Sequence, residues 1–142
     1  MPASIVAIAD AVTTELNATS FSQSFSAARH YEPTFELSAM ATLRVSVVPR
    51  GMTSKTLDRN RDSFEYEIDV AVQKKTEPTL ANLDALMLLV EEIADHFRTI
   101  PLSSMPEVRC IEVANAPIYA SEHLQEFRQF TSVLTLTYRV WR

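Results

Sequence analysis

The length, composition and charge of the chain bound its class before any motif is considered. It has 142 residues, 46% hydrophobic and 22% charged, which is typical of one folded domain, and its net charge of −5 argues against a general affinity for nucleic acid. Cys110 is the only cysteine and Gly51 the only glycine, so the sequence excludes an intramolecular disulfide, a cysteine-based metal cluster and the glycine-rich loops that hold nucleotide phosphates.

The first predicted element is a helix that begins at Ser4, a good N-cap residue, and ends at the polar stretch 17–24. No secretion signal precedes this helix, and no apolar run of the chain could span a bilayer, so we expect maturation in a cytoplasm and no membrane partner. Its predicted core stripe recurs at helical spacing and comprises Ile5, Ile8, Ala9, Val12 and Leu16.

Two strands and a long polar loop are predicted next. "SFSAARHYEP" alternates loosely and should end at Pro33, whereas "TLRVSVV" alternates clearly and should end at Pro49. The segment "RGMTSKTLDRNRD", residues 50–62, is then expected to be the loop of a hairpin, and loops of this length are usually functional or disordered. It carries four basic residues, Arg50, Lys55, Arg59 and Arg61.

The strand that follows, "SFEYEIDVAVQKK", has the clearest alternation in the chain. One buried and one wet face is typical of an antiparallel sheet that is covered on one side. The predicted buried face contains Phe64, Tyr66, Ile68, Val70 and Val72, and the wet face contains Glu65, Glu67, Asp69 and Gln73.

A second helix is expected after Thr79, a predicted N-cap residue. Leu88 does not belong to its main apolar stripe but projects with Asp84, Glu92 and Asp95, so we expect Leu88 to face a partner. The predicted core stripe comprises Leu83, Leu86, Met87, Val90, Ile93, Ala94 and Phe97.

The last third of the chain contains a strand, "EVRCIEVAN", an irregular connection, "APIYASEHLQEF", and a final strand from about Phe130 to Arg142. In the final strand, Arg139 and Trp141 lie on the face opposite the predicted core face. An exposed tryptophan at a strand end is a liability on a monomer, but both residue types are enriched at interfaces, so we expect them to touch a neighbouring subunit. The predicted core face contains Leu134, Leu136, Tyr138 and Val140.

The order of these elements is α-β-β-β-α-β-β, with no repeat and no separable linker, so residues 1–142 are expected to form a single domain. Because the strands follow one another instead of alternating with helices, the pattern predicts an α+β fold. We expect a mainly antiparallel sheet of four to five strands with two helices packed on one face and the opposite face left polar.

No residue pattern predicts catalysis, a metal site or a cofactor. Glu92 and His96 have metal-ligand spacing on one helical face, but a pair alone is equally typical of a solvated helix end. His123, beside Ser121 and Glu122, does not follow a recognisable nucleophile turn. The carboxylates of the third strand could hold a cation, match basic residues of another subunit, or simply face water.

Two stretches, "LDALMLLVEEIADHFR" and "FRQFTSVLTLTYRV", together with the element order, resemble the head-tail morphogenesis proteins of tailed bacteriophages, most closely the tail terminator (tail completion) family. The resemblance implies a homo-oligomeric ring, usually a hexamer, at the head-proximal end of a tail. Such a ring ends polymerisation of the tail tube and joins the tail to the neck without covalent chemistry. It implies assembly in the host bacterial cytoplasm, a final place in the virion, contacts with tube and neck proteins, and passing contact with DNA in the lumen.

Other assignments fit the same pattern: another neck, connector or minor tail protein, or a small cellular α+β enzyme or ligand-binding domain. The family has no motif that assigns individual residues. From the residue pattern alone, the predicted oligomer or partner interface comprises Arg50, Lys55, Arg59, Arg61, Glu65, Glu67, Asp69, Leu88, Arg139 and Trp141.

Overall fold

The computed structural model describes residues 4–31, 43–75, 79–115 and 129–141. His123, with Ser121 and Glu122, therefore lies outside the described residues. The elements, in order, are α1 (Ser4–Ala18), β1 (Ser26–Arg29), β2 (Arg44–Thr56), β3 (Asp62–Lys75), α2 (Leu80–Thr99), β4 (Arg109–Ala114) and β5 (Gln129–Trp141). This order confirms the predicted α-β-β-β-α-β-β arrangement and the α+β class.

The strands form one five-stranded sheet in the order β1-β2-β3-β5-β4. The pairings of β2 with β3, β3 with β5 and β4 with β5 are antiparallel, as expected. β1 pairs with β2 in parallel, with Ala27 opposite Val45, so the sheet is mixed and not purely antiparallel. β3, the strand with the clearest alternation, lies at the centre of the sheet, between β2 and β5.

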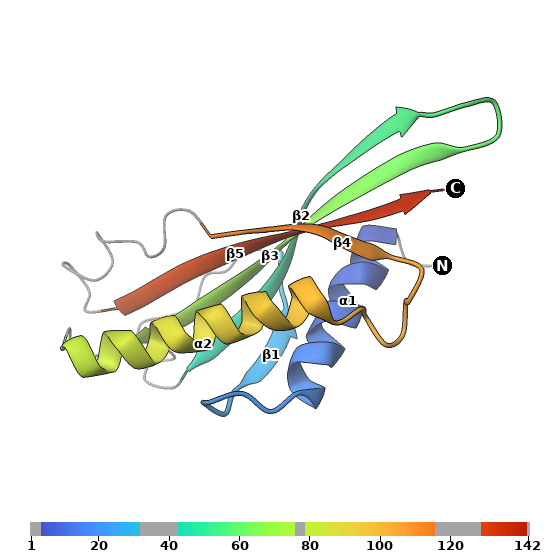
Figure 1. Ribbon diagram of the computed structural model, residues 1–142. Helices are drawn as coiled ribbons and strands as arrows, with labels where there is room; N and C mark the ends of the chain where they lie inside the picture. The colour runs from blue at the N-terminus through green and yellow to red at the C-terminus, as the bar shows by residue number, and fades with distance from the viewer. Residues whose placement is uncertain (1–3, 32–42, 76–78, 116–128, 142) are drawn as a thin grey trace.

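Both helices lie on one side of the sheet (Figure 1), as predicted. α1 packs on β1, β2 and β3, and α2 packs on β4 and β5. Their apolar residues join the sheet in one core cluster, in which Ile8, Val12, Leu89 and Ile93 are at most 1% exposed. The main strand contributions to that cluster are Val45, Val47, Tyr66, Ile68, Val70, Val72, Leu134, Leu136 and Tyr138.

Side-chain hydrogen bonds set the ends of both helices. Thr79 Oγ1 accepts a hydrogen bond from the Asn82 backbone N–H at 3.3 Å, which confirms the predicted N-cap of α2. Just before α1 ends, the Asn17 amide exchanges two hydrogen bonds with the backbone of Ala27, at 2.8 and 3.1 Å. Asn17 therefore fixes β1 against the end of α1. Neither helix in the described part of the chain is long and apolar enough to cross a membrane.

The segment 50–62 is not the long loop that the sequence suggested. β2 continues through Pro49 to Thr56, and β3 begins at Asp62, so only residues 57–61 turn the chain. The register shifts between Pro49 and Gly51, which leaves Arg50 as the extra residue of a β-bulge. Proline is tolerated at bulges because its missing N–H is not needed there, so Pro49 bends the strand without ending it.

The face of the sheet opposite the helices is polar over only part of its area. Ser46, Val48, Ala71 and Gln73 are all less than 9% exposed and lie outside the main core cluster. Their alternation with Val45, Val47, Val70 and Val72 places them on the second face. The expectation of a polar face was therefore wrong over this part of the sheet: β2 and β3 are buried on both faces here, and the acidic residues Glu65, Glu67 and Asp69 lie on the same face nearer the hairpin turn.

Candidate assembly surfaces

The β2–β3 hairpin projects away from the two-helix body and ends in an exposed turn (Figure 1). We call residues 55–61 the hairpin tip; all of them are exposed. The Asp58 carboxylate accepts hydrogen bonds from the N–H groups of Asn60 and Arg61 at 2.8 and 2.9 Å, and the Leu57 N–H donates to the Arg61 carbonyl at 3.1 Å. The turn is therefore ordered by its own hydrogen bonds.

The hairpin tip combines an apolar side chain with positive charge. Leu57 is 52% exposed. The tip holds three basic residues, Lys55, Arg59 and Arg61, against one acidic residue, Asp58. Arg61 lies 3.7 Å from Asp58, whereas Lys55 and Arg59 form no ion pair within the described part of the chain. The tip therefore presents uncompensated positive charge around an exposed leucine.

Three predicted interface residues meet on the charged face of the sheet. The Arg50 guanidinium, brought onto this face by the bulge, lies 3.7 Å from both Glu67 and Asp69 and donates a hydrogen bond to Thr135 Oγ1 at 3.1 Å. Thr135 Oγ1 in turn donates to Asp69 at 2.8 Å. Burial raises the pKa of Asp69, although the Thr135 hydrogen bond and the Arg50 charge oppose that rise.

The same face carries a second charge pair at the end of β5. Arg139 donates a hydrogen bond to Glu65 at 2.8 Å, across the β3–β5 pairing that places these residues opposite each other. Trp141, two residues further, lies opposite Ser63 and is 53% exposed. The acidic stripe is thus matched to Arg50 and Arg139 of its own chain, while Trp141 stays available to a partner.

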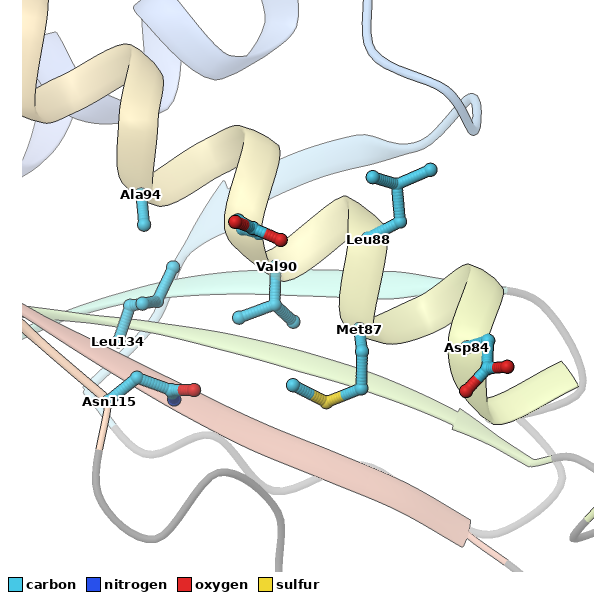
Figure 2. A pocket seen from close by; sticks show the side chains of 8 residues that line it. Asp84, Met87, Leu88, Val90, Ala94, Asn115 and Leu134 are labelled. Carbon is cyan, nitrogen blue, oxygen red and sulfur yellow. The ribbon is translucent and has the colours of Figure 1, made fainter. Parts of the chain in front are cut away.

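A pocket of about 430 Å³ opens between α2 and the β4–β5 edge. Its floor is apolar: Figure 2 shows Met87 and Val90 pointing from α2 toward the strands, where Leu134 and Asn115 lie. Its rim on α2 is formed by Asp84, Leu88 and Glu91, which follow the i, i+4, i+7 spacing of one helical stripe. Leu88 is 51% exposed, as its position beside the acidic residues suggested.

His96 does not form a metal site with Glu92. Its Nε2 atom lies 3.0 Å from Glu15 Oε1 of α1, and Ser103 donates a hydrogen bond to the other carboxylate oxygen at 3.1 Å. Glu92 instead accepts from the Ser22 backbone N–H at 3.2 Å. No group of three potential metal ligands occurs among the described residues.

Cys110 and Tyr138 face each other across β4 and β5 at the core edge. Burial raises the pKa of the Cys110 thiol, and burial, together with the nearby thiol and Glu15, raises the pKa of the Tyr138 hydroxyl. Both shifts favour the neutral groups, so neither residue is poised as a nucleophile or base.

The structure brings together the predicted residues of the charged face and separates them from Leu88 and from the tip. Sequence patterns missed Leu57, which stood inside a segment expected to be an irregular loop. They also missed the pocket, because its floor combines residues from α2, β5 and Asn115. The acidic residues of its rim could be recognised only by their helical spacing with Leu88.

Comparison with known proteins supports the fold assignment at the level of structure. No family model matches the chain, and no curated protein matches it significantly. Among solved structures it is similar to the sheath/tube terminator of an extracellular contractile injection system, PVC, in its extended state. The TM-score is 0.50 at 12% sequence identity, over 100% of this chain and 58% of the other. The chain therefore spans little more than half the length of that protein, and its fold is similar to the fold of that sheath/tube terminator.

Proposed function

We propose that this chain is a structural subunit of a tail terminator that forms a ring, of six copies, at the head-proximal end of a phage or phage-like tail. The observation that carries the proposal is the fold shared with a sheath/tube terminator over the whole of the present chain. In this role the protein catalyses no covalent step. One face of the ring complements the last ring of the tube, and the other face does not template a further tube subunit.

The partners in this proposal are other copies of the chain, the tube protein and the neck proteins, with sheath protein added if the tail is contractile. DNA passes through the lumen and makes only transient contact. The finished ring belongs to the virion, at the junction of tail and neck, after assembly in the host cytoplasm.

The described surface supports a ring because it offers unlike patches at different places. A basic hairpin tip and an acidic-rimmed apolar pocket lie on different elements, and Trp141 adds an exposed apolar residue on a third. A ring needs contacts in which one patch meets a different patch of the neighbour.

Light scattering coupled to gel filtration, followed by negative-stain imaging, tests this proposal. We expect a concentration-dependent oligomer with six-fold rings. A second assay adds the purified protein to polymerising tube protein, where we expect shorter tubes with one ring at one end. Monomers at high protein concentration, together with unchanged tube lengths, would contradict the proposal.

A further inference from the structure

We infer that the hairpin tip of one copy docks in the α2 pocket of the next copy, with Leu57 over the apolar floor and the basic residues of the tip against the acidic rim. This inference rests on the proposed ring and adds to it the two surfaces that meet. The observations that carry it are the opposite charges, the exposed leucine on an ordered turn, and the position of tip and pocket on the molecule.

The two surfaces are complementary in charge and in polarity. Asp84 and Glu91 on the rim are exposed and form no ion pair within the described part of the chain, as is also true of Lys55 and Arg59 on the tip. Opposed free charges steer two surfaces together and fix their register, and they suppress contacts between two tips or between two pockets. We therefore expect the tip of one copy to meet the pocket of another copy.

The apolar parts supply the binding free energy. Leu57 and Leu88 are about half exposed, at 52% and 51%, in the separate chain. The pocket floor offers Met87, Val90 and Leu134, and the pocket volume of about 430 Å³ accommodates the Leu57 side chain of the tip. An anchor side chain in an apolar pocket surrounded by polar groups is the usual arrangement of an interface hot spot.

The tip cannot occupy the pocket of its own chain. Figure 1 shows the β2–β3 turn and the first half of α2 at opposite ends of the molecule. The tip can therefore reach this pocket only on another copy of the chain. Such a head-to-tail contact is heterologous. It closes into a ring when the rotation between neighbours is a full turn divided by a whole number.

Site-specific cross-linking tests the contact in the full-length protein. Two variants, Leu57→Cys and Leu88→Cys, are each made with Cys110→Ser and treated with a short bis-maleimide. Because the contact joins unlike surfaces, we expect covalent dimers in the mixture of the two variants and at least about tenfold fewer in either variant alone. The double variant Leu57→Cys/Leu88→Cys should give a ladder that ends at the closed ring.

The matched control replaces Leu88→Cys by Ile111→Cys, on β4, where the native side chain is 42% exposed but lies outside the pocket. Little cross-linking is expected between Leu57→Cys and Ile111→Cys. Equal cross-linking of Leu57→Cys with either partner, or with itself, would overturn the inference.

Charge exchange gives an independent test that does not depend on cysteines. Lys55→Glu/Arg59→Glu, and separately Asp84→Lys/Glu91→Lys, should each raise the protein concentration for half-assembly by about tenfold at low salt, because two rim pairs become repulsive. A single variant that carries all four changes should recover assembly, because its tip and its rim again have opposite charges. The control Lys75→Glu/Arg109→Glu changes net charge by the same amount as the tip variant, at exposed positions that neither belong to the tip nor line the pocket, and should leave assembly unchanged.

The outcomes separate this inference from the proposed function. Suppose that the Lys55→Glu/Arg59→Glu variant still forms rings like those of the wild type, and that Leu57→Cys does not cross-link to Leu88→Cys. This result would overturn the tip-in-pocket contact and leave the terminator proposal standing. A wild-type protein that stays monomeric and does not shorten tubes would remove both.

Discussion

The His96 imidazole Nε2 lies 3.0 Å from Glu15 Oε1, and the two side chains are only 11% and 12% exposed. This contact joins α2 to α1, and Ser103 donates a hydrogen bond to the other oxygen of the Glu15 carboxylate. The histidine that by spacing resembled half of a metal site is thus one end of a polar link between the two helices.

Removal of the Glu15 carboxylate should destabilise the fold. Glu15→Ala leaves the largely buried His96 imidazole without its carboxylate partner, and the loss of such a partner typically costs about 1–3 kcal/mol. Urea denaturation followed by circular dichroism measures the change in the free energy of unfolding. The control is Asp10→Ala on the same helix, which breaks the exposed ion pair with Arg29 and should cost about 1 kcal/mol or less. Equal losses for the two variants would contradict the structural role assigned to Glu15.

Asp69 should make stability fall as pH rises through the acidic range. Its pKa is raised in the folded state, so the folded chain binds the proton more tightly than the unfolded chain does. The stabilising effect of the proton is fully present below the unfolded pKa and is lost as pH rises through the folded pKa. Asp69→Asn should therefore be more stable than wild type at neutral pH, and the difference should shrink toward zero in acid. The prediction would be contradicted if Asp69→Asn were less stable than wild type by an amount that grows as pH rises.

Leu88 and Leu89 are neighbours on α2 with opposite environments, at 51% and 0% exposure. Leu89→Ala removes a core side chain and should cost about 2–5 kcal/mol of unfolding free energy. Leu88→Ala should change unfolding by about 0.5 kcal/mol or less and should weaken assembly. Thermal unfolding and light scattering on the same samples distinguish the two effects. Normal assembly of Leu88→Ala would exclude this residue from the interface.

Trp141 should contribute to assembly and not to folding. Because it is 53% exposed at the end of β5, Trp141→Ala should change unfolding little, whereas truncation of a tryptophan at an interface typically costs about 2 kcal/mol or more of binding free energy. Analytical ultracentrifugation over a concentration series measures the second quantity. Tyr31→Ala, at a site 71% exposed, is the control and should leave assembly unchanged.

Patterns with a strong period were predicted well because burial on one side imposes that period. The alternation of β3 from Phe64 to Val72 and the helical stripe of α2 from Leu86 to Phe97 both face the single core cluster. The end of β2 was missed for the opposite reason. Beyond Arg50 both faces of the strand are exposed, so no apolar alternation is required, and Pro49 reads as a strand end although it lies at a bulge.

The charged face shows the same limit for the candidate site. The acidic residues of β3 were identified from alternation, but their partners were not, because Arg50 reaches Glu67 and Asp69 only through the bulge, and Arg139 meets Glu65 only through the β3–β5 register. Which residues lie opposite one another depends on strand pairing, which has no local signature in this sequence.

The sequence by itself determined the class of fold, the order of the elements and the inner face of both helices, of β3 and of β5, since these follow from local periodicity and from the free energy of burying apolar side chains. Only the tertiary structure decided the parallel pairing of β1, the burial of Ser46 and Ala71 on the second face, the length of the hairpin, and the pocket behind Leu88. Those features depend on contacts between residues far apart in the chain, where packing, register and bulges select among arrangements that local preference leaves equal.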